Sequence, residues 1–154
     1  MTSTPLTESE LEAWGERLGR ILDPPAFVCL RGPLGAGKSV LARAIARGAG
    51  VDAEMPSPTF NLVFRYVGAG GKRVVHLDLY RIDDVEEVWE LGWEELGAPG
   101  EVVLVEWPER AEPLLPPDRY EIALSDAGGD RRAVSLRELG DVAALAEAAG
   151  VQGG

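Results

Sequence analysis

Residues 32–39 of the chain read Gly-Pro-Leu-Gly-Ala-Gly-Lys-Ser, which matches the pattern Gly-x-x-x-x-Gly-Lys-Ser/Thr. The apolar run Ala26–Leu30 before it predicts a buried strand, and a helix is expected over Lys38–Arg47. Glycines allow the backbone N–H groups to point inward as an anion-binding nest, and the helix N-terminus adds its positive dipole end. The order of strand, turn and helix therefore predicts a phosphate-binding loop (P-loop), with a chance match in an ordinary glycine-rich turn as the alternative.

Helical and strand patterns alternate along the rest of the chain. Thr7 and Glu10 form a capping box that opens a helix ending near Leu22. Strands are expected over Phe60–Val67, Arg73–Leu79, Glu101–Val105, Tyr120–Leu124 and Ala133–Leu136, and helices from Asp83 or Asp84 to Leu91 and over Leu139–Ala149. This alternation predicts an α/β fold of the P-loop NTPase kind, in which helices flank a central, mostly parallel sheet in three layers and antiparallel hairpins are added.

Four side chains are candidates for the chemistry of a bound nucleotide. Lys38 can reach the β- and γ-phosphates, and the hydroxyl of Ser39 can ligate Mg²⁺. Glu106 directly follows an apolar strand, which is the position of a second metal-side carboxylate; a solvated glutamate at a strand end is the alternative. Asp78 ends another alternating strand, where it could order a metal-bound or attacking water, or be an exposed acid of an edge strand.

Three further segments refine this prediction. The only asparagine, Asn61, is followed by Leu62, so the chain has no Asn/Thr-Lys-x-Asp segment to specify guanine, and ATP is favoured over GTP. Ser57–Thr59 lies after the P-loop helix, where a hydroxyl can sense a γ-phosphate, although an ordinary proline turn is the alternative. Trp107 is interpreted either as a core side chain or as a contact to the nucleotide.

The composition limits the other classes of function. Among 154 residues, 26 are acidic and 15 basic, and a formal net charge of −11 gives no general attraction for a nucleic-acid backbone. A single cysteine, Cys29, excludes an internal disulfide, and a single histidine, His76, excludes a multi-histidine metal site. No apolar run reaches the roughly 18 residues of a membrane span, and the N-terminus has no signal-peptide pattern. A cytoplasmic protein without membrane partners is therefore expected.

Four motifs in a fixed order resemble the TsaE family (formerly YjeE), small bacterial ATPases of tRNA threonylcarbamoyladenosine (t6A) biosynthesis. In chain order they are Gly35–Ser39, Ser57–Phe60 with Leu62, Val63 and Tyr66, then His76–Arg81, and Leu104–Pro108. The resemblance extends from about Thr7 to the second of the predicted hairpins, which is formed by the strands Tyr120–Leu124 and Ala133–Leu136. It implies one P-loop ATPase domain over residues 1–154, with a frayed tail from about residue 150.

The same resemblance implies ligands, partners and residue roles. It implies ATP and Mg²⁺ as ligands. It also implies TsaB and TsaD as partners, which transfer threonylcarbamoyl to the adenosine beside the anticodon. This chain would then contact tRNA only indirectly, through the complex. Hydrolysis would be slow alone and stimulated by the partners. The implied nucleotide contacts are Thr7, Gly35, Ala36, Gly37, Lys38, Ser39, Val40, Thr59 and Trp107; the implied metal ligands are Ser39 and Glu106; and the implied catalytic residues are Lys38, Asp78 and Glu106. The second hairpin matches the family poorly, which leaves contacts from Asp130 or Arg131 open.

Two other functions remain open from the sequence. A small-molecule kinase needs a substrate-binding insertion and a lid, usually with paired arginines, and the only adjacent pair is Arg131-Arg132 in a predicted hairpin. A non-enzymatic, ATP-responsive binding module needs the P-loop but no hydrolysis.

Overall fold

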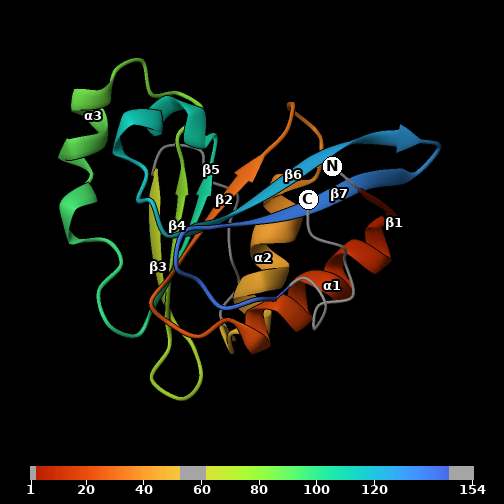
Figure 1. Cartoon of the computed structure of the whole chain (residues 1–154), viewed down its shortest axis with the longest axis horizontal. Helices are drawn as coiled ribbons and strands as arrows, with labels where there is room; N and C mark the ends of the chain where they lie inside the picture. The colour runs from red at the N-terminus through yellow and green to blue at the C-terminus, as the bar shows by residue number, and fades with distance from the viewer. Residues whose placement is uncertain (1–2, 53–61, 146–154) are drawn as a thin grey trace.

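The computed structural model describes residues 3–52 and 62–145. Their strands form one seven-stranded sheet in the order β1-β7-β6-β2-β5-β4-β3 (Figure 1). The strands are β1 (Thr4–Thr7), β2 (Ala26–Arg31), β3 (Val63–Val67), β4 (Arg73–Asp78), β5 (Glu101–Glu106), β6 (Arg119–Gly128) and β7 (Arg131–Leu139). The four central strands β6, β2, β5 and β4 pair in parallel. Antiparallel pairs complete both edges: β3 pairs with β4 on one side, and on the other β7 pairs with both β6 and β1.

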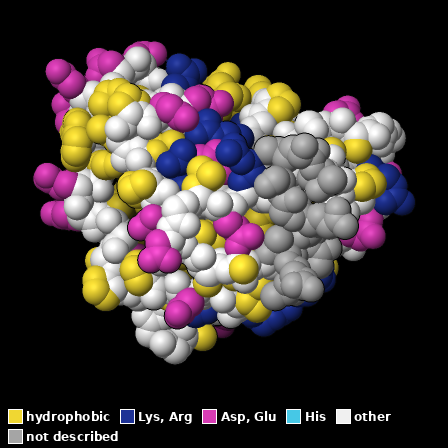
Figure 2. Space-filling view, in the orientation of Figure 1, with side chains coloured by type: hydrophobic (Ala, Val, Ile, Leu, Met, Phe, Trp, Pro, Cys, Tyr) yellow, Lys and Arg dark blue, Asp and Glu magenta, His cyan; other side chains and the backbone are white. Residues whose placement is uncertain are grey.

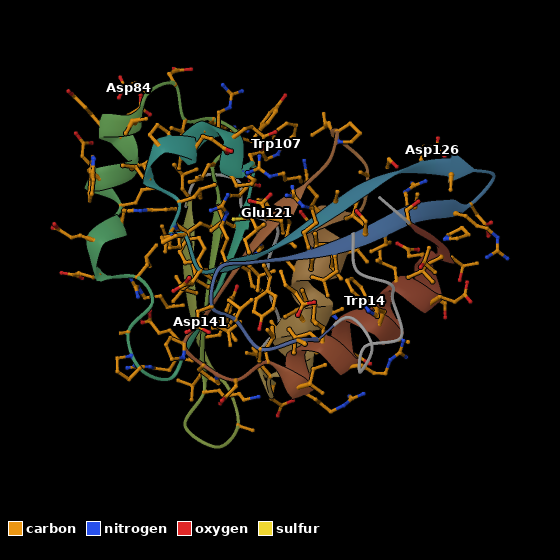
Figure 3. The ribbon with its side chains drawn as sticks, viewed as in Figure 1. Trp14, Asp84, Trp107, Glu121, Asp126 and Asp141 are labelled. Carbon is orange, nitrogen blue, oxygen red and sulfur yellow. The ribbon has the colours of Figure 1, made fainter. Side chains whose placement is uncertain are left out.

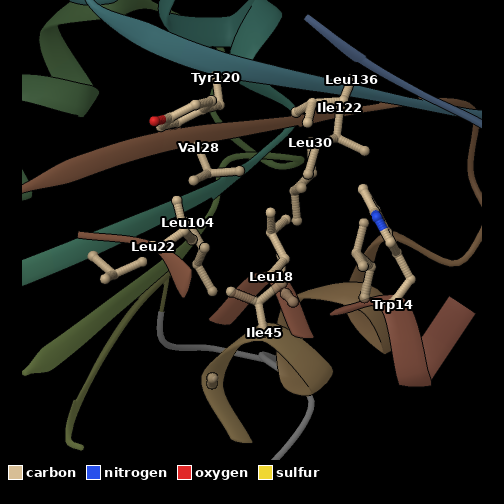
Figure 4. Close-up of a cluster of buried hydrophobic side chains, with 14 of the residues drawn as sticks. Trp14, Leu18, Leu22, Val28, Leu30, Ile45, Leu104, Tyr120, Ile122 and Leu136 are labelled. Atoms are coloured by element: carbon tan, nitrogen blue, oxygen red, sulfur yellow. The ribbon is translucent and has the colours of Figure 1, made fainter. Parts of the chain in front are cut away.

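Helices cover both faces of this sheet, which confirms the predicted α/β fold. They are α1 (Glu8–Ile21), α2 (Lys38–Gly48) and α3 (Val85–Glu90), with the 3-10 helices η1 (Trp93–Glu95) and η2 (Pro108–Leu114). The larger buried cluster lies between the sheet and the pair α1 and α2, and includes Trp14, Leu18 and Ile45 (Figure 4). A second cluster on the opposite face joins the sheet to α3, η1 and η2.

The capping box that the sequence predicts for α1 is present. The Thr7 hydroxyl accepts a hydrogen bond from the Glu10 N–H at 3.2 Å, and the Thr7 N–H donates to the Glu10 carboxylate at 2.9 Å. Further along, α1 crosses α2 at very short range. A Cβ on Gly19 would lie 2.0 Å from the carbonyl oxygen of Ile45. Glycine at this position therefore lets the two helices approach backbone to backbone.

The predicted terminal helix over Leu139–Ala149 is wrong where the structure describes it. Leu139 ends β7, opposite Arg119 of β6, and residues 140–145 have no helical structure. The alanine-rich composition favours a helix, but sheet pairing and Gly140, which has a φ of 74°, override that local preference. Residues 146–149 of that predicted helix lie outside the described residues. So do the predicted tail from about residue 150 and the segment Ser57–Thr59.

Two smaller differences concern the N-terminal strand and α3. The strand β1 was not expected, because four residues carry too little pattern to indicate a strand. Of the two candidate caps of α3, Asp84 occupies the N-cap position and accepts the Glu87 N–H at 3.3 Å. Across the described residues, no helix combines the length and the apolarity that a membrane crossing requires.

Candidate nucleotide site

The loop between β2 and α2 contains glycines at positions where a side chain would be strained or would not fit. Gly37 is the N-cap of α2 with a φ of 102°, a left-handed conformation that favours glycine. Gly32 passes close to β6, since a Cβ there would lie 2.5 Å from the carbonyl oxygen of Leu124. The N-cap Gly37 gives α2 no side-chain cap hydrogen bond, which leaves N–H groups of the first turn able to donate hydrogen bonds to an anion.

Ser39 and Glu106 meet where the N-terminus of α2 approaches the carboxyl end of β5. The Ser39 hydroxyl lies 3.0 and 3.1 Å from the two carboxylate oxygens of Glu106 and donates to them. His76 of β4 contacts the same carboxylate, with Nε2 2.6 Å from Oε2. Glu106 is only 2% exposed, so the alternative of a solvated glutamate at a strand end is wrong.

Asp78 lies beside Glu106, because the two residues are register partners at the ends of the parallel strands β4 and β5. Its Oδ1 accepts the Tyr80 N–H at 3.1 Å. Burial raises the pKa of Asp78, and the neighbouring Glu106 adds to the rise, while the Tyr80 amide, His76 and Lys38 oppose it. Since β3 pairs with β4 on its outer side, Asp78 is not an acid of an edge strand.

Lys38 is held inside the site by two contacts. Its ammonium group donates to the carbonyl oxygen of Gly32 and lies 3.3 Å from the ring centroid of Trp107, a cation–π contact. Only 4% of Lys38 is exposed, and this burial lowers its pKa against the opposing pull of Glu106 and of nearby carboxylates. The cation is therefore close to the loop and partly stripped of water.

Trp107 packs partly as a core side chain and also lines the pocket, while a contact to a nucleotide stays a prediction. The side chain packs against the second buried cluster, and its ring also contacts Lys38 and lies 4.9 Å from the ring of Tyr80. Among the described residues it is the one non-glycine with a positive φ, 59°. Figure 3 places Trp107 at the start of η2, directly after β5. This strained backbone turns the ring from the strand toward the loop.

These elements surround a pocket of about 580 Å³. The residues predicted to contact nucleotide or metal or to be catalytic that line this pocket are Gly35, Gly37, Lys38, Ser39, Val40, Asp78, Glu106 and Trp107. Thr7 and Ala36 do not line it, although Glu8 and Leu11 from the turn that Thr7 caps do. Thr59 lies outside the described residues.

The sequence interpretation missed several members of this site. His76 was given no role of its own, although it begins the motif His76–Arg81 and its alternation with Asp78 along β4 indicates that both face α2. Tyr80 follows Asp78 within the same motif and lines the pocket. From the second hairpin, Asp130 and Arg132 line it, whereas Arg131 is paired with Glu10 at 3.3 Å.

Comparison with known proteins identifies the family. The profile described as "Threonylcarbamoyl adenosine biosynthesis protein TsaE" matches residues 6–134. The chain belongs to the TsaE family. A TsaE protein of Rickettsia conorii is 37% identical over 131 residues, covering 84% of this chain and 74% of the relative. A Bacillus subtilis TsaE is 33% identical over 132 residues, covering 86% and 82% of the two chains.

The fold of a solved structure agrees with this membership. The crystal structure of Bacillus subtilis YdiB superposes with a TM-score of 0.63 and 26% identity, covering 87% of this chain and 85% of that chain. The chain is thus a member of a family of tRNA threonylcarbamoyladenosine biosynthesis, as the four sequence motifs indicated.

Proposed function

We propose that the chain binds ATP with Mg²⁺ in the pocket beside α2 and hydrolyses it to support tRNA t6A modification. The observation that carries this proposal is the contact of the Ser39 hydroxyl with the buried Glu106 carboxylate, with Lys38 at the same loop. A hydroxyl, a carboxylate and an ammonium group at the N-terminus of a helix are the groups that a metal-bound triphosphate needs.

The donor set of the site fits Mg²⁺. This ion takes one or two protein oxygens, keeps several waters and completes its shell with phosphate oxygens. Ser39 and Glu106 supply two such oxygens, already about one hydrogen bond apart at 3.0 Å. His76 lies 2.6 Å from the other carboxylate oxygen, so it can keep Glu106 oriented toward the ion.

The remaining residues have separate tasks in the proposed hydrolysis. Ser39 and Glu106 would hold Mg²⁺, which would supply charge neutralisation at the phosphate oxygens in the transition state. Lys38 exchanges the Gly32 carbonyl for phosphate oxygens, and the loop N–H groups hold the rest of the polyphosphate. Asp78 orients the attacking water, and its raised pKa makes it a better proton acceptor than an ordinary carboxylate.

The partners proposed are TsaB and TsaD in the cytoplasm, with this chain as their ATPase and not as the transferase. Contact with tRNA would be indirect. Acidic side chains are spread over the face shown in Figure 2, and basic ones gather near its centre. In the region of Glu121, which Figure 3 labels, Arg31 and Arg119 both donate to this carboxylate, and Arg31 also pairs with Glu112 at 2.9 Å. These ion pairs support a protein-mediated role, because they pair two of the arginines, Arg31 and Arg119, that could otherwise meet an RNA backbone.

The test is a reconstituted modification assay. TsaB, TsaD, tRNA and the threonylcarbamoyl donor are combined with and without this chain, and both phosphate release and modified tRNA are measured over several turnovers. We expect slow hydrolysis by the chain alone, faster hydrolysis with the partners and more modified tRNA when the chain is present. No gain in multiple-turnover product would contradict the proposed role. Phosphate transfer to a metabolite would favour the kinase alternative.

A further inference from the structure

The charged side chains that line the pocket are mostly acidic, so an anionic ligand there requires a cationic side chain in addition to Lys38. Among the described residues that line it, four are carboxylates, namely Glu8, Asp78, Glu106 and Asp130. The two lining cations are Lys38 and Arg132. A polyphosphate brings several negative charges into this acidic surrounding, and Mg²⁺ with Lys38 compensates only part of them. Arg132 is therefore the one other lining side chain of the described part that can favour the ligand's charge.

The position of Arg132 follows from the alternation of β7. Val134 and Leu136, two and four residues further along the same strand, are fully buried in the cluster between the sheet and the helices α1 and α2. Arg132 shares their face and so extends over the side of the sheet where the P-loop lies. Arg131, whose place in the alternation is on the opposite face of the strand, pairs with Glu10 and does not line the pocket.

The contacts of Arg132 leave its guanidinium available for exchange. Nη2 donates to the carbonyl oxygen of Gly35 over 3.4 Å, so the group already rests on the phosphate loop. Its ion pair with Asp126 is long, 4.0 Å, and the Asp126 side chain is 77% exposed. Such a pair is weak in water, and a phosphate oxygen is a stronger acceptor for a guanidinium fork. Figure 3 shows Asp126 on the β6–β7 arm, which reaches away from the sheet.

We propose that Arg132, presented by the β6–β7 hairpin, is a second cationic contact to the polyphosphate of the bound nucleotide. The inference rests on the proposed function, since it names a further residue of the same pocket. On binding, the guanidinium leaves the Gly35 carbonyl and Asp126 and donates to phosphate oxygens. The hairpin thereby closes one side of the nucleotide site, and Arg132, not its neighbour Arg131, makes the contact.

Equilibrium binding to the full chain tests this assignment. Calorimetric titrations with ATP in the presence of Mg²⁺ and with inorganic tripolyphosphate are compared for the unmodified chain, Arg132→Gln, Arg132→Lys and the matched control Arg131→Gln. Loss of one charge-assisted contact predicts that Arg132→Gln weakens both ligands about tenfold. Arg132→Lys should lie between, because it keeps the charge and loses the fork. Arg131→Gln should bind both ligands as the unmodified chain does.

The outcomes separate this inference from the proposed function. If the unmodified chain binds neither ligand, the proposed function fails. If it binds both and Arg132→Gln binds them equally well, only the role of Arg132 is refuted. An equal loss in Arg131→Gln would likewise overturn the assignment, since it would indicate a general effect of the hairpin charge. Thermal unfolding checks that each variant is folded, and Arg132→Lys provides the comparison if Arg132→Gln is not.

Discussion

Replacing Glu106 by glutamine separates the stability of the fold from the chemistry of the site. Glutamine keeps the size of the side chain, and its amide oxygen can still accept the Ser39 hydroxyl that lies 3.0 Å away. The negative charge is lost, however, and with it the proposed metal ligand. We therefore expect Glu106→Gln to fold, to bind ATP with a weakened dependence on Mg²⁺ and to hydrolyse it far more slowly.

The two expected magnitudes come from the surroundings of Glu106. Its carboxylate is 2% exposed, and burying an ion costs several kcal/mol, which the neutral amide avoids. Against this gain, the contacts to Ser39 and His76 each weaken by about 1 kcal/mol when the acceptor is neutral. The two effects nearly cancel, so the free energy of unfolding should change by less than about 2 kcal/mol. Turnover should fall by about 10²–10³, the cost of one fixed charge-stabilising group.

Glu101→Gln is the matched control, because Glu101 is the other buried glutamate of β5. It is 6% exposed, lies at the opposite end of the strand and accepts the N–H groups of Gly97 and Ala98 at 3.1 and 3.3 Å. Phosphate release is measured with the partners present at saturating ATP and Mg²⁺, and stability by urea unfolding. Glu101→Gln should lose stability and keep its turnover. Turnover of Glu106→Gln close to that of the unmodified chain, or an equal loss in both variants, would refute the role given to Glu106.

Three further predictions concern the scaffold. Gly19→Ala should lower the free energy of unfolding by about 1–3 kcal/mol in urea titrations, because its Cβ would lie 2.0 Å from the Ile45 carbonyl oxygen. Cys29 should resist iodoacetamide at pH 8 and react once the chain is unfolded in urea, since burial raises the pKa of its thiol to about 12. Burial alone would raise the pKa of Glu121, but hydrogen bonds from Arg31 and Arg119 hold it below the ordinary 4.5. Its contribution to stability is therefore present at neutral pH and lost as the pH falls through that lowered value, so urea titrations between neutral and acidic pH should show a shallower loss in Glu121→Gln than in the unmodified chain.

The sequence predicts which residues come together at this pocket where their positions follow from local order. The glycines before Lys38 and Ser39 mark the loop, and the acid after an apolar run marks the carboxyl end of β5. Because parallel strands bring their carboxyl ends to one edge, Asp78 and Glu106 meet although 27 other residues separate them along the chain. The fold class follows from the same alternation of strands and helices.

What the sequence could not predict depends on pairing between distant segments. The contact of His76 with Glu106 needs the register of β4 against β5, which no single-strand pattern determines. The choice between Arg131 and Arg132 needs the pairing of β7 with β6, including the irregular step between Asp126 and Gly128. The terminal helix was wrong over its described residues, because pairing carries β7 as far as Leu139 and Gly140 then takes a positive φ.

The helix packing far from the P-loop has a consequence for the pocket itself. Glu8 and Leu11, which line the pocket, lie in the first turn of α1, while α2 begins at the P-loop. The two helices are fixed relative to each other by the glycine contacts of their other ends, where a Cβ on Gly19 or Gly48 would meet backbone oxygen at 2.0 Å. Widening that crossing would move the first turn of α1 against the loop Gly32–Gly37. The close approach at these two glycines therefore bears on the shape of the pocket as well as on the stability of the core.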